Sequence, residues 1–325
     1  MPSLRPIQPS ILRGGPVVQV KLPGDGPFDG SFRAVVFDGG IPQAVRGGLA
    51  PWVTVIEPTG IGPAAPALEA HGLAVTSALL FGPLEQGVTA RRPVCSIDHV
   101  RVIDDNLNHG DLEYHDVLDR IVGYLDANEG KHQFVNISIG PNMAVDDDDV
   151  TAWTASLDER LAHGKAVATV AAGNDGTKDR LAGLHRVQPP ADAVNVLSVG
   201  AADHLGTTWA RSDYSCMGPG RSPGIVKPDG VMFGGSTVEP FTAMGSTGEL
   251  RGITGTSFAA PFALRSAASV RAQLGSELTP LGIRALLIHR AEQAGHKTSE
   301  VGWGRFEWDS NRLITCEDDE ALIVF

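Results

Sequence analysis

Three polar side chains of this 325-residue chain stand next to predicted strands or helices, where catalytic groups are often placed. Asp38 ends the apolar run 35–37 and is followed by two glycines, which predicts a buried strand that carries a carboxylate at its carboxyl end. His71 precedes the apolar helical segment 73–80, so we expect an imidazole at a helix start. Asn174 follows another apolar run, and its amide can donate a hydrogen bond to an oxyanion.

Ser257 carries a hydroxyl that could act as a nucleophile. It lies in the segment Gly-Thr-Ser-Phe-Ala-Ala-Pro, 255–261, a turn that leads into a predicted helix. The N–H groups and the dipole at a helix N-terminus stabilise negative charge that develops there. We expect Pro261 in the first turn, where its missing N–H has no intrahelical partner to lose. Ser and Thr are also common helix caps, so this segment alone does not establish a nucleophile.

Together these four side chains could hydrolyse an amide bond. Ser257 would attack the carbonyl carbon, His71 would accept its proton, and Asp38 would orient the imidazole. Asn174 and the backbone N–H of Ser257 would bind the oxyanion. Each residue alone has an ordinary structural explanation as a turn, cap or buried polar residue. Their combination, in the order Asp, His, Asn, Ser, indicates catalysis.

Strand-like and helix-like segments alternate along the chain. This alternation predicts an α/β fold with a doubly wound, mostly parallel sheet flanked by helices and with ligands at the carboxyl ends of its strands. The expected strands are 51–57, 99–104, 134–140 and 166–173, and the expected helices are 72–81, 112–125 and 150–163.

Composition narrows the class of partner. The net charge is −12 and no Lys/Arg-rich run occurs, so we expect no nucleic acid and no membrane as partners. Three cysteines without C-x-x-C spacing predict buried free thiols and neither a disulfide framework nor a zinc site. Residues 1–15 lack the apolar core of a signal peptide, so we expect a cytoplasmic protein.

Residues 146–149 are four consecutive aspartates. They either favour the N-terminus of the helix that follows or form an acidic patch near the substrate cleft. The second alternative weakly favours a basic or large polar substrate residue just before the cleaved bond.

The sequence resembles the subtilisin-like serine peptidases (subtilases). The order of Asp38, His71 and Ser257 matches that of subtilisin, and the motif around Ser257 is close to the family signature. The resemblance covers about 33–306. It implies a subtilisin-like fold and a serine endopeptidase that uses an Asp-His-Ser triad, an acyl-enzyme and an oxyanion hole.

The resemblance also implies where a peptide or protein substrate binds. The substrate would pair in extended conformation between two segments, whose residues are Ser138, Ile139 and Gly140 on one side and Ala171, Ala172 and Gly173 on the other. Other segments similar to the family are 196–203, 227–229 and 302–304.

Three departures from the family mark a divergent branch. Gly39 stands where the family usually has Ser or Thr, Ala74 replaces a second histidine, and 232–235 differ from the usual Ala-Pro-Gly turn. Residues 81–88 offer one carboxylate where the family often binds calcium, so we expect no metal and no cofactor.

We expect three parts: an N-terminal extension, 1–32, a peptidase domain, 33–308, and a C-terminal tail, 309–325, that begins a further domain. Secreted relatives carry an inhibitory prodomain, whereas roughly thirty residues precede the Asp38 strand here, with one extra strand at 16–22. Control is therefore expected from a regulatory partner or from narrow specificity.

Two other classes of function stay open. One is a catalytically weak pseudo-peptidase or peptide-binding module on a subtilase scaffold, and the other is a serine esterase, although G-x-S-x-G is absent around Ser257. Within the peptidase interpretation, the chain could be a housekeeping processor or a component of a bacterial defence system.

Overall fold

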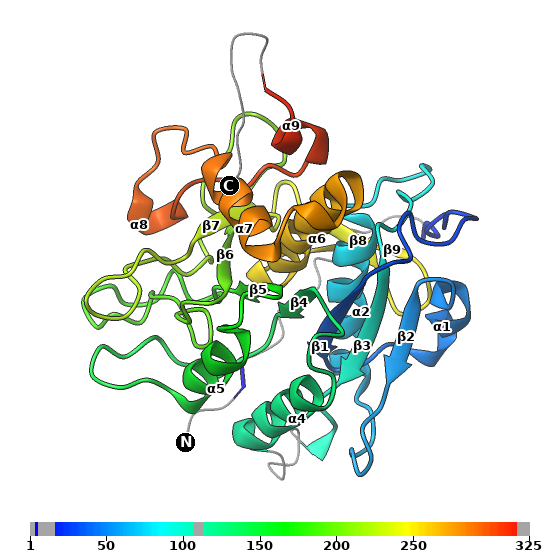
Figure 1. The fold of residues 1–325 in the computed structure, drawn as a ribbon, viewed down its shortest axis with the longest axis horizontal. Coiled ribbons are helices and arrows are strands. Elements are labelled where there is room, and N and C mark those ends of the chain that lie inside the picture. Colours follow the sequence, from blue (N-terminus) through cyan, green and yellow to red (C-terminus); the bar gives the residue numbers. More distant parts are fainter. Residues whose placement is uncertain (1–3, 6–16, 107–112, 317–325) are drawn as a thin grey trace.

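Parallel strands form the centre of the molecule. The computed structural model describes residues 4–5, 17–106 and 113–316. Its main sheet has seven strands in the order β2-β3-β1-β4-β5-β6-β7, and each pairs in parallel with its neighbours (Figure 1). They are β1 Arg33–Asp38, β2 Val53–Ile56, β3 Ser96–Arg101, β4 Phe134–Ile137, β5 Val167–Ala171, β6 Leu197–Ala202 and β7 Gly230–Phe233. A separate antiparallel hairpin joins β8 Phe241–Met244 to β9 Leu250–Ile253.

Helices cover both faces of this sheet, which confirms the predicted doubly wound α/β fold (Figure 1). One face packs against α1 Gln43–Leu49, α2 Pro66–Phe81, α6 Thr256–Leu274 and α7 Pro280–His289, and the other packs against α4 Tyr114–Ala127 and α5 Ala152–Leu161. Strand β1 shows the division, because Ala34 and Val36 join the first core while Val35 and Phe37 join the second.

The predicted start of the second helix was wrong. Helix α2 begins at Pro66, so His71 lies inside it and not at its N-terminus. Ala65 is extended and Pro66 occupies the first helical positions, where the fixed φ of proline favours helix initiation. The apolar run that we used to predict the helix reflects only its most buried part. Strand β3 likewise begins at Ser96, before the predicted 99.

Segments outside the main sheet contact the rest of the fold near both ends of the described chain. The predicted strand at 16–22 appears, within the described 17–22, as single bridges from Gln19 to Glu249 and from Lys21 to Thr89. At the other end, α8 Thr298–Val301 is followed by α9 Ser310–Ile314, whose Leu313 is buried in the first core. The apolar end of the expected C-terminal tail, 317–325, lies outside the described residues.

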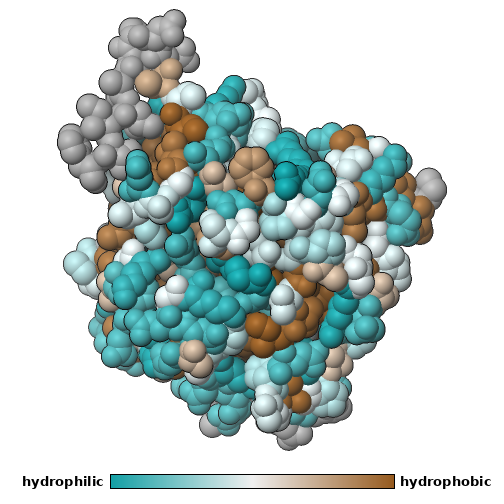
Figure 2. Space-filling model, turned by 45° about the vertical axis from the view of Figure 1, so that its right-hand side comes forward, coloured by the Kyte–Doolittle hydropathy of each residue, from teal (hydrophilic) through white to brown (hydrophobic). Residues whose placement is uncertain are grey.

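Figure 2 shows one face on which hydrophilic residues dominate and hydrophobic residues form separate patches. Within the ranges that the structure describes, no helix combines the length and the apolar character needed to cross a membrane.

Cys95 and Cys216 are buried as expected, and burial raises the pKa of each thiol to about 12. Cys316 is exposed, contrary to the expectation.

A buried carboxylate, Asp98 on β3, joins the sheet to its surroundings. It is 2% exposed and contacts Arg33, Lys131 and His132, with His132 Nε2 2.9 Å from Asp98 Oδ2. Burial alone would raise the pKa of Asp98, but the hydrogen bonds from His132, Arg33 and Lys131 outweigh it and hold that pKa well below its usual range.

We predict that Asp98→Asn lowers the free energy of unfolding by about 3 kcal/mol at pH 7, because it removes the buried carboxylate charge to which Arg33, Lys131 and His132 bind. The native carboxylate has a depressed pKa, so its contribution is present above the unfolded pKa and is lost as the pH falls below about 4. Urea unfolding at several pH values measures this. The matched control, Asp126→Asn, removes an exposed partner of Arg160 and should cost less than about 1 kcal/mol. Equal losses for both variants would contradict the prediction.

Candidate active site

The sequence-predicted residues meet at one edge of the sheet. Asp38 is the last residue of β1, Ser138 follows the end of β4, and Asn174 follows the end of β5. Strands β1, β4 and β5 are parallel neighbours, so their carboxyl ends lie together. Ser257 is the second residue of α6, a helix that packs against β4 and β5.

Asp38 and His71 form a buried pair. The Nδ1 atom of His71 lies 2.9 Å from Oδ1 of Asp38, and the backbone N–H of Gly39 donates to the same oxygen at 2.7 Å. Because a carboxylate can only accept, Nδ1 carries the proton and Nε2 of a neutral His71 keeps its lone pair. Oδ2 of Asp38 is buried without a hydrogen-bond partner among the described residues. The His71 tautomer with its proton on Nδ1 is the one that a general base requires.

The glycine after Asp38 has a steric reason. A Cβ atom at Gly39 would lie 2.6 Å from both the Cβ and the carbonyl oxygen of Leu68, in the first turn of α2. Ser or Thr therefore cannot occupy this position while α2 packs so closely. The sequence departure reflects the approach of the helix that carries His71.

Ser257 lies beside the Asp38–His71 pair. The ring of His71 is 5.8 Å, centroid to centroid, from the ring of Phe258, the residue after Ser257. The hydroxyl of Ser257 donates to the carbonyl oxygen of Ser138 at 3.2 Å, and no hydrogen bond among the described residues joins it to His71. Catalytic hydrogen bonds often tighten only when substrate binds, and rotation about χ1 would turn this hydroxyl toward another acceptor.

Pro261 is not in the first turn of α6, and that prediction was wrong. The helix begins at Thr256, so an N–H at position 261 would have bonded to the carbonyl oxygen of Ser257. The hydroxyl of Ser138 donates to this oxygen instead, at 2.9 Å. Ser138 thus replaces the helical hydrogen bond that Pro261 removes, and it fixes the first turn of α6 to the end of β4.

Asn174 is held with its amide oxygen toward α6. Its Oδ1 accepts hydrogen bonds from the backbone N–H and from the hydroxyl of Thr256, each at 3.0 Å. The hydroxyl of Thr256 also accepts from the N–H of Gly173 at 3.2 Å. The amide nitrogen of Asn174 is consequently the end that remains to donate to a ligand.

The two predicted substrate-binding segments are neighbours. Strands β4 and β5 pair up to Ile137 and Val170, so Ser138, Ile139 and Gly140 run beside Ala171, Ala172 and Gly173. The aspartates at 146–149 take neither expected role in full. Asp147 accepts hydrogen bonds from Arg186 at 2.9 and 2.7 Å and from the N–H of Ser222, whereas Thr151 caps α5.

Sequence reasoning missed His99, which lies on β3 beneath the Asp38 turn. Its Nε2 accepts from the N–H of Gly40 at 3.1 Å, so Nδ1 carries the proton and donates to the hydroxyl of Thr76 at 2.8 Å. Burial lowers the pKa of His99 to about 4, against the opposing charge of Asp38. A histidine on the strand beside the Asp38 strand was the available signal, but its register with Val36 was not readable from the sequence.

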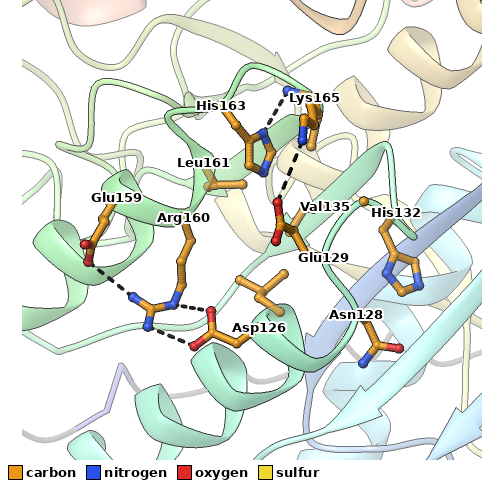
Figure 3. Close-up of a pocket in the computed structure, with 13 residues that line it drawn as sticks. Asp126, Asn128, Glu129, His132, Val135, Glu159, Arg160, Leu161, His163 and Lys165 are labelled. Atoms are coloured by element: carbon orange, nitrogen blue, oxygen red, sulfur yellow. Dashed lines mark hydrogen bonds and ion pairs between the residues drawn. The ribbon is translucent and has the colours of Figure 1, made fainter.

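Another pocket, shown in Figure 3, lies at the opposite end of the sheet. It is lined by residues near the amino ends of β4 and β5, among them His132 and Ala166. Its charged side chains pair with one another, as in Arg160 with Asp126 at 2.8 Å and Lys165 with Glu129 at 3.7 Å. The Asp38, His71 and Ser257 edge is therefore the candidate active site.

We predict that native stability falls as the pH drops from about 6.5 to about 4, with His99 contributing on the order of 3 kcal/mol. The folded state keeps this imidazole neutral, whereas the unfolded chain binds a proton below its ordinary pKa, so acid favours unfolding. In His99→Leu the dependence of the free energy of unfolding on pH should become flatter, whereas the exposed control His163→Leu should keep the native dependence. Chemical denaturation across this pH range is the measurement, and an unchanged slope in His99→Leu would exclude the assignment.

Comparison with known proteins agrees with this geometry. The family model described as Subtilase family matches residues 54–304, a range that contains His71, Asn174 and Ser257 and begins after Asp38. Comparison with curated proteins gives no match.

Solved structures share the fold. The self-cleaved protease domain of PatA is 22% identical, with a TM-score of 0.61 over 87% of this chain and 95% of that one. The prenylagaramide maturation protease PagA is 21% identical, with a TM-score of 0.64 over 88% and 95% of the two chains. The epidermin leader peptide processing protease EpiP from Staphylococcus aureus is 18% identical, with a TM-score of 0.65 over 91% and 78%. Because the family model spans most of the sheet and three of the four candidate residues, the chain belongs to the subtilase family of serine endopeptidases.

Proposed function

We propose that the chain hydrolyses peptide bonds through Asp38, His71 and Ser257, with Asn174 and the Ser257 N–H as the oxyanion hole. The observation that carries this proposal is the buried 2.9 Å contact between Asp38 and His71, which sets the tautomer of the base beside the first turn of α6, where Ser257 lies.

The proposed reaction has two stages. Ser257 Oγ bonds to the substrate carbonyl carbon while its proton passes to His71 Nε2, and the carbonyl oxygen becomes an oxyanion. His71 then gives that proton to the leaving nitrogen as the C–N bond breaks, which leaves an acyl-enzyme and a free amine. Water then attacks the acyl carbon while His71 accepts its proton, and His71 returns that proton to Ser257 Oγ as the acid is released. Asp38 stabilises the imidazolium in both stages.

The oxyanion would be bound at the start of α6. The first-turn N–H of Ser257 has no intrahelical acceptor, and Asn174 is oriented by Thr256 so that its NH₂ group is left to donate. Both donors are fixed before the reaction begins, so little reorganisation is needed when charge develops.

We predict that Ser257→Ala and His71→Ala each reduce kcat by about 10⁴-fold or more, and that the double variant loses little further activity, because the groups act as one unit. Hydrolysis of a peptide library measures this, with His163→Ala as the control. Precursor peptides form a sensible first substrate set, since similar structures include a maturation protease and a leader-peptide processing protease.

A serine-directed phosphonate separates the enzyme from a pseudo-peptidase. Labelling of Ser257 in the native chain, and not in Ser257→Ala, is the expected result. Matched peptide and ester substrates separate a peptidase from an esterase, for which the ester alone would be turned over. Full activity in Ser257→Ala would refute the assignment.

We predict that Asn174→Leu lowers kcat by roughly 100- to 1,000-fold with little change in KM, because the amide binds charge that appears only after the ground state. This is the loss known for removal of one oxyanion donor from subtilisin, carried across to Asn174. Steady-state kinetics on one peptide substrate provides the test. A rise in KM at constant kcat would instead assign Asn174 to ground-state binding. The cytoplasmic location and a regulatory partner stay predictions from the sequence.

A further inference from the structure

A short part of the N-terminal extension lies against the expected substrate-binding segment. Leu4 forms an antiparallel bridge with Pro141, and the backbone N–H of Arg5 donates to the carbonyl oxygen of Gly140 at 2.8 Å. An extended peptide bound by strand addition makes contacts of the same kind. The chain therefore supplies its own occupant for part of the cleft.

The side chain of Arg5 spans both edges of that cleft. Its Nη1 donates to the carbonyl oxygen of Ala171 at 2.8 Å, and Nη2 donates to those of Ile139 at 3.0 Å and Pro189 at 3.4 Å. The Nε atom is buried without a hydrogen-bond partner among the described residues. A guanidinium group has a planar set of donors, so it can bond to carbonyl groups on two sides at once.

The pocket is shaped for this group. A Cβ atom at Gly140 would lie 2.5 Å from Nη2 of Arg5 and 2.4 Å from the carbonyl oxygen of Pro189, so glycine leaves the space that the guanidinium uses. Carbonyl dipoles supply negative potential, and Asp175 adds a carboxylate charge that favours protonated Arg5. Burial lowers the pKa of Arg5 to about 10, which still keeps it charged at neutral pH. The carboxylate of Asp175 accepts from the amide of Gln188 at 2.6 Å and pairs with the half-exposed Lys178 at 2.9 Å.

We propose that this pocket recognises an arginine side chain of the peptide substrate, and that Arg5 occupies it as an internal competitor. The proposal rests on the proposed peptidase function and names its substrate class. It assigns the preference for a basic residue to the carbonyl groups that accept from Arg5, supported by the charge of Asp175, because the aspartates at 146–149 are not among the groups that hydrogen-bond to Arg5. The backbone N–H of Arg5 bonds to Gly140, whereas the Ser257 hydroxyl donates to the carbonyl oxygen of Ser138, two residues earlier. Arg5 therefore fills the pocket while its own peptide bond is displaced from the nucleophile.

Binding can be tested without catalysis. The double variant Arg5→Ala, Ser257→Ala is titrated with a labelled peptide of residues 1–8 and with the same peptide carrying Ala or Lys in place of Arg5. We expect at least tenfold weaker binding with Ala and an intermediate loss with Lys, because the three donors of an ammonium group lie on one nitrogen and lack the planar fork with which guanidinium reaches both edges. The single variant Ser257→Ala, which keeps Arg5, should bind the arginine peptide at least tenfold more weakly than the double variant. Equal binding of the Arg and Ala peptides would overturn the proposal even if the chain proves to be an active peptidase.

Kinetics supplies the second test. Peptides in which Arg or Leu is scanned through each position should show a preference for Arg at one position. Arg5→Ala should lower KM for those peptides about tenfold with kcat unchanged, and the added 1–8 peptide should restore competition. The exposed control Arg312→Ala should leave KM unchanged. Asp175→Asn should lower the Arg to Leu ratio of kcat/KM, whereas the surface control Asp126→Asn should not. No Arg preference, or an unchanged KM in Arg5→Ala, would overturn the proposal, while absence of hydrolysis by every variant would instead refute the peptidase function.

Discussion

The close packing of α2 on the turn after β1 is the contact on which the candidate site depends. It requires that residue 39 have no side chain, because the backbone of Leu68 occupies the space. This approach brings His71, inside the helix, to the carboxylate at the end of the strand. His99 supports the same turn from below through the N–H of Gly40. Any widening of this helix–turn contact would separate the base from the group that orients it.

The other half of the site depends on α6, which packs behind the central strands. Its first residues place a serine hydroxyl and orient an amide through Thr256. The substrate-binding segments then extend from the strands that this helix covers, and the proposed arginine pocket lies between them. Recognition and chemistry therefore share the carboxyl edge of one parallel sheet, as is usual in doubly wound folds.

Local patterns in the sequence were enough to place Asp38 and Asn174 after the ends of strands, because apolar runs that stop at polar residues indicate the carboxyl ends of buried parallel strands. Helix boundaries were less accessible. Apolar character marked the buried part of α2 and hid its start at Pro66, and Pro261 was misplaced because the partner of the freed carbonyl is distant in sequence. Arg5 could not be anticipated either, since its contacts join it to residues 134 and 166 positions away.

The hydrogen bond from the Ser138 hydroxyl to the Ser257 carbonyl oxygen links the expected substrate-binding segment directly to the residue that carries the nucleophile. Proline at 261 removes the N–H that would normally bond to the carbonyl oxygen of Ser257 within the helix. The position of Ser257 is therefore fixed relative to the segment that begins at Ser138. A peptide that aligns on this segment is thereby aligned with the attacking atom, and thermal displacement of one carries the other with it. Residues 138 and 261 therefore act together in positioning Ser257, and the residue type at one position should constrain the residue types that evolution accepts at the other.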